Sequence, residues 1–334
     1  MNRLVLIFIF LLLMSACGSA DDFFEELENA GVIDSILVNP SSPVDSTGRH
    51  PSDTIRVPND STIMPKDSTS NDEDSMKVDD SLTVAHQSEI EFTRLFTIKS
   101  KSTRSTQGFA IYGDELFNFH DANDVIDVYN MKTCKVVASI DLEPESNVHC
   151  NTVSFSNKFY SNDDKYPLIY VQQGGLENKV NVYRIQYVDS SYSAQKIQMI
   201  SLSPCTHSLT AIDRDNNKLY IIYSYSGRYI GYSDIPDFSS SEVVLNLIKA
   251  EKTYAIKIPK VVQDTAFGSG SLYFVCGYSK EGELWKIDMK TKTAKVIDLT
   301  KYGLNGEPEG LEEYEGNIIM SFSNRSVYKI KINE

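Results

Sequence analysis

Histidine, carboxylate and amide side chains recur near the beginning of several similar segments in residues 90–334. Such side chains form hydrogen bonds, and carboxylate and amide oxygens are ligands for hard cations such as Ca²⁺. The candidate residues are Gln107, His149, Asn151, His207, Gln263, Asp264 and Glu309. If the fold brings them together, they form a ring of donors and acceptors suited to a sugar or another polar ligand.

The chemistry that these side chains favour is binding rather than catalysis. The sequence contains no Ser–His–Asp order, no zinc-binding spacing and no glycine-rich phosphate loop. Glu309, Asn151 and Asp264 offer oxygen ligands, so the alternative is a metal-dependent lactonase-type hydrolase with Ca²⁺ or another divalent cation as its cofactor. No general base is identifiable, and nothing in the spacing demands a cofactor. The same side chains would also serve simply to satisfy backbone groups and water in a narrow channel.

The elements that position these residues are short strands. Runs rich in Val, Ile, Tyr and Phe are broken every few residues by Gly, Asn, Asp or Ser, which is typical of an all-β domain. Residues 107–140 contain four such runs joined by tight turns, and residues 262–299 repeat the pattern. Less regular copies occupy residues 150–202, 206–258 and, with only three clear strands, 309–332.

Repeated four-stranded units are typical of the blades of a β-propeller. The count predicts five blades, or six if residues 206–258 are divided, and residues 92–99 are expected to supply the strand missing from the last unit and to close the ring. The innermost strands of a propeller start at one face, so the candidate residues are expected to converge there. A β-sandwich is the alternative fold, because it also contains many short strands.

Two short motifs in residues 90–334 give a resemblance to known families. Residues 106–109 (Thr-Gln-Gly-Phe) are similar to the opening blade of glutamine cyclotransferase-like propellers, and residues 308–314 (Pro-Glu-Gly-Leu-Glu-Glu-Tyr) to a Glu-Gly strand of these and of gluconolactonase-like propellers. As an architecture, the region resembles the TolB-like propellers of Bacteroidetes lipoproteins. The other cyclotransferase motifs, including those with tryptophan, are absent, and the single tryptophan is Trp285. The resemblance therefore implies the propeller but not cyclotransferase activity.

The N-terminus has the layout of a signal peptide. Arg3 precedes an apolar run of 11 residues, 4–14, which is shorter than the roughly 20 residues that a membrane-spanning helix needs. The small residues before Cys17 resemble a bacterial lipobox, in which the cysteine receives a diacylglycerol after removal of residues 1–16. Ordinary signal cleavage near Ala16 or Ala20 is the alternative. The sequence thus predicts a membrane as partner, through a lipid anchor.

Residues 17–38 follow the anchor and begin with an acidic stretch. Asp21, Asp22, Glu25 and Glu26 resemble the export signal that places Bacteroidetes lipoproteins on the outer face of the outer membrane. The alternative is an acidic stretch that serves only to keep the anchor region solvated. The resemblance implies a lipid-anchored outer-membrane protein exposed at the cell surface.

Residues 39–89 are predicted to be a disordered stalk, because they are dominated by Ser, Asp, Thr and Pro and cannot bury enough apolar surface. Asp followed by Ser or Thr and then by an aliphatic, Met or Thr residue recurs through residues 34–82 and resembles the O-glycosylation acceptor of Bacteroidetes exported proteins. The candidate acceptors are Ser35, Ser46, Thr54, Ser61, Ser68, Ser75 and Ser81. Sugars there would stiffen the stalk and shield it from proteases.

The acidity of the chain belongs to its N-terminal part. Residues 1–89 hold five Lys and Arg against sixteen Asp and Glu, a balance of −11 out of −14 for the whole chain. Residues 90–334 are nearly neutral and lack a basic cluster with interleaved aromatic residues, which argues against nucleic acid as a partner. The expected partner is an unknown polar ligand, such as a glycan or peptide, or another envelope protein.

Four cysteines remain besides Cys17. An even number in an exported protein permits two disulfides, but cysteines inside apolar strands also pack as free hydrophobic side chains. Cys150 and Cys205 are the candidate pair, because they open neighbouring units. The other two are Cys134 and Cys276.

Overall fold

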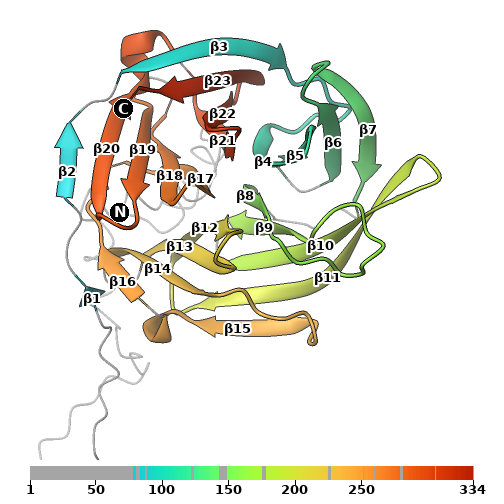
Figure 1. The fold of residues 1–334 in the computed structure, drawn as a ribbon, viewed down its shortest axis with the longest axis horizontal. Helices are drawn as coiled ribbons and strands as arrows, with labels where there is room; N and C mark the ends of the chain where they lie inside the picture. Colours follow the sequence, from blue (N-terminus) through green and yellow to red (C-terminus); the bar gives the residue numbers. More distant parts are fainter. Residues whose placement is uncertain are drawn as a thin grey trace, which may run out of the picture. The chain divides into compact units, whose positions relative to one another are not determined.

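Five β-sheets form the part of the chain that the computed structural model describes (Figure 1). It lies within one compact unit, Asp74–Glu334. The described residues are 78–79, 83–86 and 89–333, except for 122–123, 143–148, 175–177, 225–226, 251, 259, 279–280 and 305. The predicted signal peptide, Cys17, the acidic segment, most of the stalk and the O-glycosylation candidates lie outside these residues.

Each sheet contains one four-stranded antiparallel blade, and in blades 1 to 4 the strands follow chain order outward from the centre. Blade 1 contains β4 (Thr106–Tyr112), β5 (Glu115–His120), β6 (Val125–Asn130) and β7 (Lys135–Asp141). Blade 2 contains β8 (His149–Phe155), β9 (Ile169–Gly174), β10 (Lys179–Val188) and β11 (Ser191–Ser203). Blade 3 contains β12 (His207–Asp213), β13 (Lys218–Ser224), β14 (Arg228–Asp234) and β16 (Lys252–Ala255). Blade 4 contains β17 (Val262–Gly268), β18 (Ser271–Cys276), β19 (Glu283–Asp288) and β20 (Thr293–Asp298).

Blade 5 closes the ring with strands from both ends of the described chain. It contains β21 (Pro308–Tyr314), β22 (Asn317–Phe322), β23 (Ser326–Ile332) and β3 (Ile90–Thr97). Strand β3 pairs antiparallel with β23, from Thr97 opposite Ser326 to Ile90 opposite Ile332. The predicted closing strand is thus confirmed, although it runs over residues 90–97 rather than 92–99.

The innermost strands contact one another in a closed cycle. Strand β4 lies beside β8, β8 beside β12, β12 beside β17, β17 beside β21, and β21 again beside β4. The same five strands lie around the centre of Figure 1. The fold is therefore a five-bladed β-propeller, as predicted, and neither a sixth blade nor a two-sheet sandwich is formed by the described residues.

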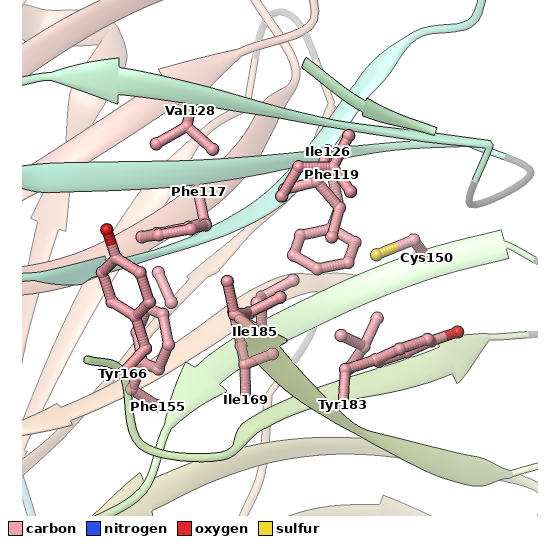
Figure 2. Close-up of a cluster of buried hydrophobic side chains, with 14 residues drawn as sticks. Phe117, Phe119, Ile126, Val128, Cys150, Phe155, Tyr166, Ile169, Tyr183 and Ile185 are labelled. Atoms are coloured by element: carbon pink, nitrogen blue, oxygen red, sulfur yellow. The ribbon is translucent and has the colours of Figure 1, made fainter. Parts of the chain in front are cut away.

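Apolar side chains fill the space between neighbouring blades. Alternate residues of a strand point to opposite faces of its sheet, so each blade presents an apolar face to each neighbour. Between blades 1 and 2, Phe117 packs edge-to-face against Phe155 and Tyr166, with ring centroids 5.2 Å and 5.1 Å apart (Figure 2). Burial of one such aromatic side chain contributes roughly 1.5–3 kcal/mol, so these interfaces supply much of the stability.

Two glycines allow the innermost strands to approach closely. A Cβ atom on Gly108 would lie 2.5 Å from the backbone oxygen of Asn151, and one on Gly310 would lie 2.4 Å from Cδ1 of Phe109. Real Cβ atoms do not come this close, so any larger residue would push the strands apart. The Gln107-Gly108 and Glu309-Gly310 pairs noted in the sequence are therefore explained by packing at the centre of the ring.

Three additional strands lie outside the blades, each parallel to the outermost strand that it joins. Strand β15 (Glu242–Asn246) leaves blade 3 and pairs with β11 of blade 2. Strands β1 (Val78–Asp79) and β2 (Thr83–His86) pair with β16 and β20. These last two lie within the predicted disordered stalk, so the prediction is wrong for these six residues, whose backbone pairs with otherwise unpaired sheet edges.

Helices are minor elements of the described chain. The short 3-10 helices η1 (Leu247–Lys249) and η2 (Leu299–Tyr302) follow β15 and β20. Among the described residues, no helix is long and apolar enough to cross a membrane.

The four cysteines of the propeller are free thiols. Cys150 lies fully buried among the apolar side chains between blades 1 and 2. The thiol of Cys205 instead donates to the backbone oxygen of Leu202 at 3.4 Å. The suggested Cys150–Cys205 disulfide is thus not formed, because the two side chains serve different interfaces.

Candidate functional site

The seven predicted site residues all lie within the first three positions of an innermost strand. Gln107 is the second residue of β4, and His207 is the first of β12. The others are His149 and Asn151 of β8, Gln263 and Asp264 of β17, and Glu309 of β21. Because these strands form the closed ring, all seven residues lie at one end of it, although they differ in what they contact.

Gln107 and Glu309 are joined inside the ring. With its amide oriented to satisfy both neighbours, the Gln107 side-chain nitrogen donates to the backbone oxygen of Cys150 at 3.0 Å and to Oε2 of Glu309 at 3.3 Å. Both side chains are buried. They connect three neighbouring blades, so their principal role is to hold the ring together.

Asp264 is also a structural residue. It is fully buried, and its carboxyl oxygens accept hydrogen bonds from the backbone nitrogens of Thr265, at 2.7 Å, and Leu311, at 2.6 Å. Burial raises its pKa well above the ordinary value, and the nearby charges of Glu312 and Glu309 raise it further. This carboxyl group therefore fixes β21 against β17 and is inaccessible to a ligand.

The remaining four predicted residues face solvent at least in part, and we call them the polar rim: His149, Asn151, His207 and Gln263. Nδ1 of His149 lies 3.0 Å from Oδ1 of Asp121. The amide nitrogen of Gln263 donates to Oε1 of Glu307 at 2.9 Å. The rim therefore offers donors and acceptors, partly held in place by acidic neighbours, at the end of the ring where the innermost strands begin.

The oxygen ligands suggested for a divalent cation do not form a metal site. Both oxygens of Asp264 accept backbone hydrogen bonds, and Glu309 is the acceptor for Gln107. Within the described part of the chain, no group of three or more His, Cys, Asp and Glu side chains is arranged to hold a metal ion. Asn151, Asp264 and Glu309 therefore do not fit the site of a metal-dependent lactonase-type hydrolase.

Sequence reasoning missed an arginine and a glutamate at the opposite end of the ring. Arg214, which follows β12, donates from Nε to the backbone oxygen of Phe155 at 3.0 Å. Its Nη2 donates to the backbone oxygen of Ile111 at 3.2 Å and to Oε1 of Glu312 at 3.2 Å. One side chain thus joins four innermost strands or their ends. The signal that could have revealed it is its position directly after the end of an innermost strand.

Glu312 is the titratable partner in this contact. Burial raises its pKa to about 7, against the opposing charge of Arg214. Folding therefore makes this carboxyl group hold its proton more tightly than the unfolded chain does. Its contribution to stability is complete below the ordinary pKa of 4.5 and is lost as pH rises to about 7.

Replacing Glu312 by Gln is expected to make stability less dependent on pH. Between about pH 4.5 and 7.5, the free energy of unfolding of the unchanged protein should fall by about 3 kcal/mol more than that of Glu312→Gln, since one pKa unit corresponds to about 1.4 kcal/mol. Urea unfolding across this range measures the difference. Glu91→Gln, at an exposed position of β3, is the control. Equal pH dependence of Glu312→Gln and the unchanged protein would contradict the prediction.

The closed ring of blades defines the protein as a five-bladed β-propeller. Its similarity to known proteins is a similarity of this architecture. No family model and no curated protein matches the chain. Among solved structures it is similar to the glutaminyl cyclase of Myxococcus xanthus, with 14% identity and a TM-score of 0.49 over 75% of this chain and 98% of that one. It is also similar to the PQQ-bound aldose sugar dehydrogenase of Streptomyces coelicolor, with 10% identity and a TM-score of 0.45 over 75% of this chain and 100% of that one.

A third similar structure is a structural genomics protein of unknown function from Bacteroides thetaiotaomicron. It shares 11% identity, with a TM-score of 0.41 over 74% of this chain and 77% of that one. At identities this low, such likenesses concern the fold alone.

Proposed function

We propose that this protein is a cell-surface binding lipoprotein. In this proposal, a lipid on Cys17 anchors the chain in the outer membrane, and a glycosylated stalk holds the propeller away from the membrane surface. The propeller binds a polar ligand, such as a glycan, a peptide or a segment of another envelope protein, at the polar rim. It belongs to the TolB-like propellers of Bacteroidetes lipoproteins.

The contrast between buried and accessible groups supports this proposal. Asp264 and Glu309 have carboxyl groups suited to chemistry, but they are buried and hydrogen-bonded to neighbouring strands. The accessible groups are imidazole and amide side chains of the rim, which suit recognition through hydrogen bonds. This division favours ligand capture over catalysis.

Ligand binding can be tested with the purified protein and a panel of oligosaccharides and short peptides. Each compound is screened for an increase in Tm, and any that stabilise the protein are titrated by calorimetry. We expect Asn151→Ala combined with Gln263→Ala to weaken binding about tenfold or more, which corresponds to a loss of about 1.4 kcal/mol. Thr93→Ala, on the exposed side of β3, is the control. A ligand whose affinity is the same in the rim variant would contradict binding at this end.

A further inference from the structure

Aromatic side chains form a strip at the end of the propeller opposite the polar rim. It begins at Phe159 and Tyr160, in the loop after β8, and continues through Tyr112 at the end of β4. The ring of Tyr112 lies 6.5 Å from that of Phe159 and 6.2 Å from that of Tyr166. These contacts join the loop of blade 2 to blade 1.

The strip extends onto the long hairpin formed by β10 and β11, which reaches beyond the outer edge of the neighbouring blade (Figure 1). The ring centroid of Tyr192 lies 6.1 Å from that of Tyr166 and 4.7 Å from that of Tyr187, near the hairpin tip. At the other end of the strip, the ring centroid of Tyr160 lies 5.6 Å from that of Phe238. The strip therefore crosses several elements and offers aromatic surface at more than one place.

Three rings of the strip are exposed to solvent. The exposed fractions are 38% for Phe159, 44% for Tyr160 and 40% for Tyr187. A group of exposed aromatic side chains costs solvation free energy, and such groups commonly mark binding surfaces. The strip is thus a candidate ligand-binding surface that does not overlap the polar rim.

Neighbouring side chains hold two of the exposed rings, those of Tyr160 and Tyr187, in place before any ligand arrives. The guanidinium of Arg184 lies 4.8 Å from the centre of the Tyr160 ring. It is fixed in turn by Asp164, whose Oδ1 accepts from Nη2 at 2.7 Å and whose Oδ2 accepts from Nε at 3.0 Å. Nζ of Lys165 lies 4.4 Å from the centre of the Tyr187 ring. Such preorganised rings lose little conformational entropy on binding.

Two of the cations beside the strip are paired with an acid, and the third, Lys158, donates to the backbone oxygens of Ile235 and Pro236 while its charge interacts with that of Asp237. Lys165 pairs with Glu115 at 3.1 Å, and Arg184 pairs with Asp164. Burial would raise the pKa of Glu115, but hydrogen bonds from Tyr166, Tyr192 and Lys165 outweigh it and lower the pKa, so the group stays ionised. The strip therefore lacks the excess positive charge that recognition of nucleic acids or other polyanions requires.

A neutral carbohydrate has the chemistry that fits this surface. One face of a pyranose ring consists of C–H groups that pack on an aromatic ring, and its edge carries hydroxyl groups that donate and accept hydrogen bonds. The paired side chains Arg184–Asp164 and Lys165–Glu115 supply fixed donors and acceptors beside the rings. The exposed rings lie on two separate elements, which suits a chain of sugars better than a single sugar.

We propose that the aromatic strip, through Phe159, Tyr160 and Tyr187, binds a neutral polysaccharide. The ligand class rests on the proposed role of the propeller as a binding module, but the surface differs from the rim. This site would let the protein hold a glycan chain at one end of the ring, independently of a ligand at the other.

Affinity electrophoresis of the purified protein through gels that contain a soluble polysaccharide tests the proposal. The neutral probes are xylan, galactomannan, mixed-linkage β-glucan and glycogen, and the anionic probes are polygalacturonate and dextran sulfate. We expect at least one neutral probe to retard the protein, and Tyr160→Ala combined with Tyr187→Ala to weaken that interaction about tenfold or more. Tyr160→Phe should retain it, because the ring is kept.

Tyr278→Ala is the matched control, since Tyr278 is 37% exposed but lies outside the strip. Retardation by none of the neutral probes would overturn the proposal, as would binding only to the anionic probes. If Asn151→Ala with Gln263→Ala abolished polysaccharide binding while the tyrosine variants did not, the strip would be rejected and binding at the rim retained. Equal Tm values for the variants show that a loss of binding is not a loss of folding.

Discussion

A chain that begins at residue 98, and so lacks β3, is expected not to fold. Strand β3 is the fourth strand of blade 5, and its removal leaves the outer edge of β23 unpaired. It also removes the buried side chain of Ile90 and the stacking of Phe96 on Tyr129 at 5.2 Å. Loss of a buried isoleucine alone costs about 2–5 kcal/mol, and whole domains are stable by only about 5–15 kcal/mol.

A chain that begins at residue 87 is the matched control. It lacks β1 and β2, but these strands only add a fifth strand to blades 3 and 4, which are already complete. Circular dichroism during urea unfolding should show a cooperative transition for this control and none for the shorter chain. A synthetic peptide of residues 88–100, added to the shorter chain, should restore part of the transition. Cooperative unfolding of the shorter chain at the same urea concentration would contradict closure by β3.

The fold was predictable because its signals are local. Each blade is a meander of antiparallel strands whose turns are encoded by a few neighbouring residues. Gly113, for example, has a positive φ of 58° and lies in the turn between β4 and β5. Because the last unit of the repeat was incomplete, it required a strand from the other end of the domain, and residues 92–99 were predicted to supply it. The same repeat placed Gln107, His207 and Glu309 near the beginnings of their strands.

The properties of the site were less predictable, because they depend on contacts between distant residues. The position of a residue in its strand does not show that the side chain of Gln107 donates hydrogen bonds to Cys150 and Glu309. Nor does it show that His207 is exposed. Nor does it show that Arg214 reaches Glu312 across the ring. The aromatic strip was missed for the same reason, since its rings come from loops and strands that are far apart in the sequence.

The outer strands illustrate the limit of composition as a guide to structure. Residues 83–86 lie in a segment whose average composition predicts disorder, but they include β-branched residues and meet the free edge of β20. Residues 206–258 were predicted to form one blade or two, and the pairing of β15, which lies within them, with β11 of the preceding blade was not predicted. The average composition of a segment does not show whether a free sheet edge lies near enough for its backbone to pair with it.

Replacement of Cys17 by Ala is expected to release the protein from the membrane fraction completely. One acyl chain gives only marginal membrane binding, whereas two or three hold a protein firmly, since each buried methylene contributes about 0.8 kcal/mol. If a lipid on Cys17 is the anchor, attachment to the membrane needs no contribution from the rest of the chain. Cell fractionation followed by a carbonate wash, together with metabolic labelling by radioactive palmitate, measures both attachment and its cause.

Cys134→Ala is the control for this experiment, because it removes a free and partly exposed thiol of the propeller while leaving Cys17 in place. It should stay in the membrane fraction and keep the label. If Cys17→Ala were still resistant to the carbonate wash, the uncleaved apolar run of residues 4–14 or a protein partner would have to hold the chain. For the unchanged protein, mass spectrometry of the mature N-terminus separates lipidation from ordinary cleavage. Lipidation predicts a modified Cys17 as the first residue, whereas cleavage after Ala16 leaves Cys17 unmodified and cleavage after Ala20 removes it.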